Sequence, residues 1–169
     1  TVKEIDLASV TQLVVTDTRQ KNRLQVIHSQ LDKLTNIQIY DHHPETKDDL
    51  VADVLVAEQI GATTTLLVER LFSNAISITP FEATLFVLGI FEDTGCLTFG
   101  STSLRDVEAV YHLWQIGVNL RIISSFLNQP LTLSQRDLLD ELLSATTYYE
   151  IHGVRVGITC MQNGGYVGG

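Results

Sequence analysis

The sequence contains few cysteines and no long apolar run. Its two cysteines, Cys96 and Cys160, form neither a disulfide framework nor a CxxC metal pair, so we expect two reduced thiols in a cytoplasmic protein. The longest strongly apolar run, from Leu85 to Phe91, is far too short to span a membrane. The residues after Thr1 show no cationic start followed by an apolar middle, so no signal peptide is recognised.

Basic residues are also scarce. Eleven Lys and Arg stand against 20 Asp and Glu, which gives a net charge of −9. This balance argues against broad binding to long nucleic acid, because such binding needs a basic face. A small phosphate ester remains compatible with it, since bound cations can invert the local field. No GxGxxG motif follows any expected strand, which argues against a dinucleotide-dependent oxidoreductase.

The remaining composition is that of an ordinary globular domain. The 169 residues are 44% hydrophobic with a mean hydropathy of +0.15, which is enough for one domain with a real core. The chain begins with Thr1 and ends in the glycine-rich segment 164–169. We therefore expect a piece of a longer protein.

The order of strand and helix patterns predicts an α/β fold. Apolar, β-branched runs predict strands over 12–16, 37–40 and 53–58. Helical spacing predicts helices over 24–34, 61–71, 81–91, 119–127 and 132–147, and another after Ser103; two strands are expected over 148–161, turning at His152-Gly153. Strands alternate with helices first and helices dominate later, which predicts a mainly parallel sheet flanked by helices.

Two of these helices carry more specific predictions. Thr79-Pro80 supplies a capping hydroxyl and a first-turn proline, and the helix that follows is apolar on nearly every side, so we expect deep burial. The helix after Ser103 has an apolar stripe that we expect in the core: Val107, Val110, Tyr111 and Trp114.

Three acidic positions lie where elements should end. Asp17 and Asp41-His42-His43 directly follow expected strands, and Asp93 lies at the end of the buried helix. The carboxyl ends of parallel strands share one edge, where ligands bind. Carboxylates with imidazole suit Mn²⁺, and also Mg²⁺, Fe²⁺ or Co²⁺. A carboxylate shared by two ions would make a site able to activate water and hold a phosphoryl group.

Each position also has a purely structural interpretation. Residues 41–43 could form a solvated polar loop, and Asp17 could be a turn or capping acid. Asp93-Thr94-Gly95 could end a helix, with Gly95 supplying the positive φ. Ser103 and Asp106 are explained by capping of the next helix, although Arg105 could still reach a phosphate.

Three segments resemble the second, third and fourth motifs of the DHH phosphoesterases: 14–17, 40–44 and 89–95. The resemblance extends to 61–69 and 102–106 and spans about residues 12–147. That superfamily includes RecJ exonucleases, oligoribonucleases, cyclic-dinucleotide phosphodiesterases and manganese-dependent pyrophosphatases. Segment 61–69 looks most like the DHH domain of bacterial proteins that also carry DHH-associated, CBS and tRNA nucleotidyltransferase domains.

The resemblance implies a role for each motif residue. Asp17 matches an acid that bridges two Mn²⁺ ions, and His42 and Asp93 match further metal ligands. His43 matches the residue that contacts the substrate phosphate and helps to protonate the leaving group. Asp41 is expected to orient an imidazole.

One departure from the family pattern affects the expected activity. The family's first motif, a His and two Asp residues on the first strand, has no counterpart in residues 1–16. We therefore expect the first strand to be missing, and weak metal binding and no robust turnover from this chain alone. Residues 1–148 would be a DHH domain without that motif, and 149–169 the start of a DHH-associated domain.

Two functions are compatible with these features. The first is a metal-dependent phosphoesterase that hydrolyses phosphodiesters of short oligonucleotides or dinucleotides. The alternative is a non-catalytic nucleotide- or RNA-binding module of a tRNA nucleotidyltransferase. An intact first motif upstream would favour the enzyme, and a degenerate one the binding module.

Overall fold

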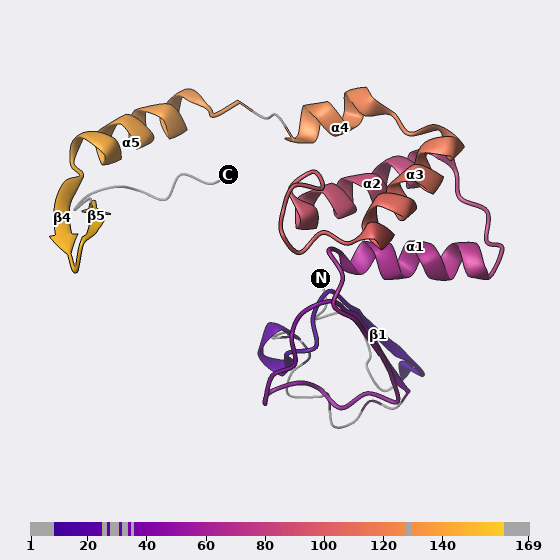
Figure 1. The fold of residues 1–169 in the computed structure, drawn as a ribbon. Coiled ribbons are helices and arrows are strands. Elements are labelled where there is room, and N and C mark those ends of the chain that lie inside the picture. Colours follow the sequence, from indigo (N-terminus) through magenta and orange to yellow (C-terminus); the bar gives the residue numbers. More distant parts are fainter. Residues whose placement is uncertain are drawn as a thin grey trace. The chain divides into compact units, whose positions relative to one another are not determined.

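The structure is a computed structural model that describes residues 9–24, 27, 31, 34, 36–127 and 130–160. The chain divides into two compact units, Thr1–Ile123 and Ser124–Gly169, and each is described by itself (Figure 1). Most of the helix expected over 24–34 lies outside the described residues. The boundary expected at residue 148 stays a prediction.

A three-stranded parallel sheet opens the first unit (Figure 1). It consists of β1 (Leu13–Thr16), β2 (Ile37–Asp41) and β3 (Val54–Ala57), with β2 in the centre. Thr16 pairs with Tyr40, so the carboxyl ends of β1 and β2 lie side by side. The α/β class and the parallel sheet predicted from the sequence are confirmed.

One face of the sheet carries an apolar core. Val15, Ile37 and Ile39 lie on this face and pack with Leu31 and Leu34, which the sequence had placed in a helix. The alternation of side chains along each strand turns these residues to the same side. Between β1 and β2 the described regular structure is a 3-10 helix, η3 (Lys21–Leu24).

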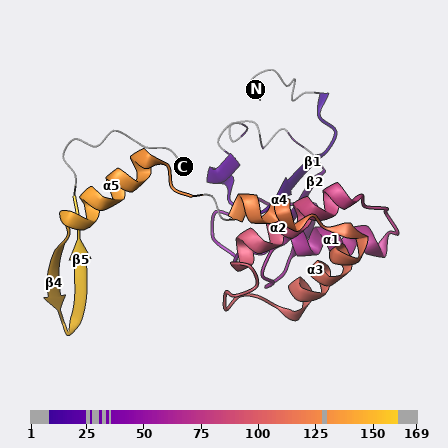
Figure 2. The ribbon, with the colours of Figure 1, turned by 90° about the horizontal axis from the view of Figure 1, so that it is seen from above.

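Three helices form the other part of the first unit. These are α1 (Thr63–Ser73), α2 (Pro80–Thr94) and α3 (Leu104–Gly117). They pack on one another, and α1 also contacts β2 (Figure 2). Their buried apolar residues are Leu66, Val68, Ala83, Val87, Ile90, Ala109, Val110 and Leu113.

The capping threonine and first-turn proline predicted for α2 are confirmed, but the deep burial predicted for the whole helix is wrong. Thr79 accepts from Glu82 N–H and Glu82 accepts from Thr79 N–H, so the helix begins with a reciprocal capping pair. Phe81 is 64% exposed and Leu85 47% exposed, so α2 is buried on one side only. A helix that is apolar on nearly every side is therefore not covered on every side within this unit.

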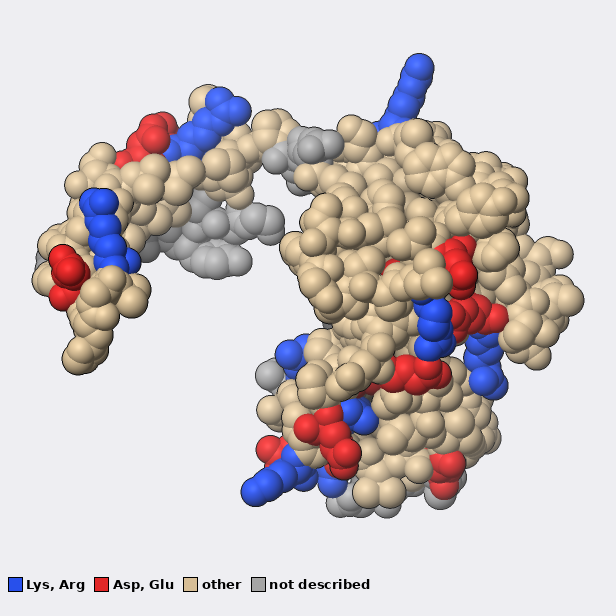
Figure 3. Space-filling view, in the orientation of Figure 1, with Lys and Arg blue, Asp and Glu red and all other residues tan. Residues whose placement is uncertain are grey.

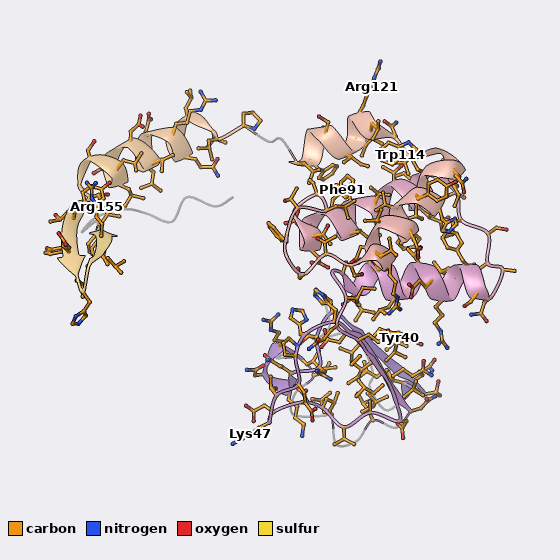
Figure 4. All side chains as sticks on the ribbon, in the orientation of Figure 1. Tyr40, Lys47, Phe91, Trp114, Arg121 and Arg155 are labelled. Atoms are coloured by element: carbon orange, nitrogen blue, oxygen red, sulfur yellow. The ribbon has the colours of Figure 1, made fainter. Side chains whose placement is uncertain are left out.

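The core stripe predicted for α3 is wrong. Trp114 is 45% exposed, and Val107 and Tyr111 are exposed with it; of the predicted four only Val110 is buried (Figure 4). The helix is rotated so that smaller side chains, with Leu113, face α1 and α2. Periodicity identified a helix with two apolar faces, and packing selected the other one.

The described residues after α3 contain two helices and a hairpin. These are α4 (Leu120–Leu127), which crosses the division between the units, α5 (Leu133–Ser144), and the antiparallel β4 (Thr147–Ile151) and β5 (Val154–Ile158). The predicted turn at His152-Gly153 is confirmed, with φ of 51° and 78°. No described helix is long and apolar enough to cross a membrane.

Candidate metal centre

Asp17 leaves β1 in an unusual backbone conformation. Its φ is 64°, in the left-handed region, where Asp and Asn are tolerated better than most side chains. Its N–H donates to Tyr40 O at 2.9 Å, so the bend is fixed against β2. The Thr63 hydroxyl, at the start of α1, donates to Asp17 Oδ1 at 3.0 Å. Sheet and helix therefore orient this carboxylate together.

His42 follows β2 and turns one ring nitrogen toward Asp17. Its Nδ1 lies 3.1 Å from Ile60 O, and because a carbonyl only accepts, we assign the proton to Nδ1. The other ring nitrogen, Nε2, lies 3.5 Å from Asp17 Oδ1 and is the atom available to a metal. A backbone carbonyl on the far nitrogen is the usual arrangement of a metal-binding histidine.

His43 is held by a buried acid. Its Nδ1 lies 2.7 Å from Oδ1 of Asp41, which is 0% exposed. The His43 and His42 rings meet edge to face, with their centroids 4.4 Å apart. The role expected for Asp41, orienting an imidazole, fits this contact and stays a prediction.

Asp17, His42 and His43 together form a donor cluster. One ligand atom from each lies within 4.8 Å of the others. Donors bound to one ion at about 2.1 Å lie roughly 3–4 Å apart, so small side-chain movements would bring these atoms around a cation. One carboxylate with two imidazoles suits a divalent first-row metal. The residues present therefore fit a metal, without deciding which one.

Asp93 lies beside the cluster but is not one of its three members. It occupies the last turn of α2, which Gly95 ends with a φ of 54°. Burial raises the pKa of Asp93, and the nearby Asp17 carboxylate raises it further, while His42 and His43 oppose both effects. A half-buried acid within electrostatic range of another acid is a position that a cation would stabilise.

Comparisons with known proteins identify the family of this chain. No family model matches the chain. Over 168 residues it is 34% identical to the A-adding tRNA nucleotidyltransferase of Geobacter sulfurreducens, covering 99% of this chain and 19% of that protein. Over 149 residues it is 30% identical to the cyclic-di-AMP phosphodiesterase PdeA of Listeria monocytogenes, covering 83% and 22%. The chain is a DHH-superfamily domain.

A solved structure supports the fold of this DHH domain. An exopolyphosphatase-related protein from Bacteroides fragilis superposes with a TM-score of 0.69 at 18% identity, covering 88% of this chain and 43% of that one. The chain spans about a fifth of the length of the two curated relatives, 19% and 22%. Membership in the DHH superfamily points to a hydrolase family in general. It does not identify the substrate of this chain.

Arg19 is a residue of the DHH domain that the sequence analysis missed. It is 8% exposed, and its Nη2 donates to His43 O at 2.7 Å. Its Nε lies 2.9 Å from Asp49 Oδ2 and 3.6 Å from Asp41 Oδ2, without hydrogen-bond alignment to either. Because these partners are distant in sequence, no local pattern identified Arg19 as a site residue. Only its position two residues after Asp17 could have suggested it.

Arg105 is already paired with carboxylates. Its Nε donates to Glu69 Oε1 at 2.7 Å, and its other nitrogens contact Glu69 and Glu58. These hydrogen bonds, first from Glu69 and then from Glu58, raise the pKa of Arg105. Figure 3 shows basic and acidic side chains interspersed on the visible face of the first unit. A phosphate contact by Arg105 stays a prediction.

Asp106 joins the starts of α1 and α3. It is 0% exposed and accepts from Gly61 N at 3.0 Å, Thr65 Oγ1 at 2.7 Å, and both N and Oγ of Ser103 at 2.7 Å. Burial acts to raise its pKa, but the bonds from Ser103, Thr65 and Gly61 outweigh burial and lower it. A Cβ at Gly61 would lie 2.6 Å from the carboxylate, so this approach requires glycine. The capping contact expected between Ser103 and Asp106 is present.

Proposed function

We propose that this DHH domain is a metal-dependent phosphoesterase that hydrolyses phosphodiester bonds in short oligonucleotides or dinucleotides. The observation that carries the proposal is the cluster of Asp17, His42 and His43 at the carboxyl ends of two adjacent parallel strands. The name of PdeA supports the substrate class, because cyclic-di-AMP is a dinucleotide. The net charge of −9 supports a short substrate rather than a long polymer.

The metal expected in this site is Mn²⁺, with Mg²⁺ or Co²⁺ as alternatives. Asp17, His42 and Asp93 would hold it. When bound, such a cation lowers the pKa of water and offsets the negative charge of the phosphoryl oxygens. Thr63 and Ile60 hold Asp17 and His42 in place without competing for the Nε2 atom of His42.

His43 is proposed to act on the substrate side of the site. Its Nδ1 is bound to Asp41, so its Nε2 is the nitrogen free to exchange a proton with the ester. His43 would bind the phosphate and then protonate the departing alkoxide.

We further propose that residues 1–169 alone turn over slowly. Three candidate ligands, Asp17, His42 and Asp93, are too few to complete the coordination of two hard cations. A His and two Asp on a preceding strand, as in the family's first motif, would supply the rest. Within this proposal 1–148 form the DHH domain and 149–169 begin a DHH-associated domain.

A second candidate is a non-catalytic nucleotide- or RNA-binding module in a tRNA nucleotidyltransferase. It is supported by 34% identity across 168 residues to a protein of that name. CBS and nucleotidyltransferase domains would then be partners in the same chain. The two candidates differ in turnover and share nucleotide binding.

Calorimetry and a hydrolysis assay separate them. The full-length protein that carries this chain should bind Mn²⁺ and cleave a linear or cyclic dinucleotide. Asp17→Asn and His42→Gln should abolish both, while His112→Gln, a histidine on α3 in ring contact with Phe72, should leave both unchanged. Dinucleotide binding without cleavage would favour the binding module. If both Asp17→Asn and His42→Gln still bind Mn²⁺, the proposed metal site is rejected.

A further inference from the structure

We propose that Arg19 is a positioning residue for His43. Its guanidinium binds the main-chain carbonyl of His43 and also lies beside the Asp41 carboxylate. Together these two contacts orient the His43 imidazole. The inference rests on the proposed function where it places His43 at the substrate. The geometry itself is independent of any substrate.

The guanidinium spans the loop that carries His43. Nη2 donates to the carbonyl at the start of the loop, His43 O, at 2.7 Å. Nε lies 2.9 Å from the carboxylate of Asp49 at its end. Asp49 is itself fixed, because the hydroxyl and N–H of Thr46 donate to it at 2.6 Å and 3.0 Å. The side chain thus connects both ends of the 43–49 loop.

The backbone on either side of Arg19 is attached to the same loop. Leu50 N donates to Arg19 O at 2.7 Å, and Lys21 N donates to Asp48 O at 3.2 Å. Gln20 and Asp49 form an isolated antiparallel bridge. Arg19 therefore approaches His43 from a fixed segment, and not from a mobile surface position.

Charge gives a second reason for an arginine here. Asp41 is 0% exposed, and its Oδ2 accepts no hydrogen bond from the described residues. A buried carboxylate without a counter-charge is strongly unfavourable. The Arg19 Nε, 3.6 Å away and nearly buried, supplies that charge on the side opposite His43. Asp41 can then keep its other oxygen on His43 Nδ1.

A lysine at position 19 could not make all of these contacts at the same time. The guanidinium places Nη2 on His43 O and Nε near both carboxylates, whereas an ammonium is one compact charge on a flexible stem. Arg19→Lys therefore keeps the charge and loses the simultaneous contacts. This substitution separates positioning of His43 from simple neutralisation of Asp41.

Crystal structures of the metal-free full-length protein test the inference. In Arg19→Lys and Arg19→Met, the His43 Nδ1 to Asp41 Oδ1 distance, now 2.7 Å, should lengthen beyond hydrogen-bond range. Arg70→Lys is the matched control, since Arg70 packs over the Tyr40 ring at 5.4 Å in the same unit, and should leave the distance unchanged. An unchanged distance in Arg19→Lys overturns the proposal, even if Arg19→Met does not fold.

Steady-state kinetics provide the second measurement. Arg19→Lys should lower kcat about 10–100-fold, the usual effect of losing a residue that orients a site group, with KM changed less than about threefold. A rise in KM with unchanged kcat would overturn the positioning role. If the unmodified protein hydrolyses no dinucleotide, the proposed function fails, and the metal-free structures still decide the role of Arg19.

Discussion

Asp41 and Asp106 are both 0% exposed, yet their surroundings differ. Asp106 accepts four hydrogen bonds from uncharged donors, so both of its oxygens are satisfied. Asp41 has one bond to His43, a counter-charge at 3.6 Å, and one oxygen that accepts no hydrogen bond from the described residues. The fully bonded acid connects two helices, whereas the incompletely bonded one contacts the imidazole that we propose to be catalytic.

The largest expected effect is on stability, at Asp106. Asp106→Ala leaves four donors without an acceptor, two of them buried and the two on Ser103 partly buried, and we expect a loss of about 4 kcal/mol in the free energy of unfolding. Urea denaturation measures it. Asp106→Asn keeps one acceptor oxygen and should lose about half as much. A loss below about 1 kcal/mol for Asp106→Ala would remove the distinction between the two acids.

At Asp41 the effect should appear in activity. Asp41→Asn keeps the size of the side chain and an acceptor for His43, but removes the charge that Arg19 faces. We expect turnover of a dinucleotide to fall about 10–100-fold. The loss in the free energy of unfolding should not exceed that of Asp106→Asn, because Asp49 still supplies a counter-charge to Arg19 at 2.9 Å. Asp106→Asn is the matched control, with normal turnover per folded molecule. Equal losses of activity in the two variants would contradict the assignment.

Two threonines two positions apart at the start of α1 allow a finer comparison. Thr65 donates to Asp106, and Thr63 donates to Asp17. Thr65→Val should reduce the free energy of unfolding by about 1–2 kcal/mol and leave Mn²⁺ affinity unchanged. Thr63→Val should weaken Mn²⁺ binding several-fold, measured by calorimetry, with a smaller loss of stability. Weaker Mn²⁺ binding in Thr65→Val than in Thr63→Val would contradict this assignment of the two hydroxyls.

The smallest effect concerns acid pH. Because its pKa is lowered in the folded state, Asp106 stabilises the fold above its ordinary pKa of 3.8, and this contribution is lost as pH falls through the folded-state value. The stability difference between the unmodified protein and Asp106→Asn should therefore be constant above about pH 5 and shrink below about pH 4. Urea titrations from pH 6 to about pH 3 measure it. A difference that grows toward acid would mean that the pKa is raised instead.

Local patterns predicted the sheet and placed Asp17 and residues 41–43 at the ends of its strands. Apolar runs ending in Asp17 and in Asp41-His42-His43 specified parallel strands, and the geometry of such strands placed their ends together. The sequence also suggested the Ser103–Asp106 cap. It could not reveal that Asp106 reaches back to α1, because that contact depends on how two helices pack.

Contacts between distant segments account for the errors and omissions. Arg19 joins three partners that no spacing rule connects, and Trp114 was assigned to the core because helical periodicity cannot choose between two apolar faces. The helix expected over 24–34 lies mostly outside the described residues, although Leu31 and Leu34 are buried as apolar residues of that segment.

The left-handed backbone at Asp17 narrows the choice of ligand at that position. A φ of 64° is accessible to glycine and tolerated by Asp and Asn, whereas longer side chains are disfavoured there by about 1–2 kcal/mol. Glutamate carries the same carboxylate, but the main chain would resist it. Redesign of the proposed metal centre is therefore constrained at the carboxylate and freer at the imidazoles.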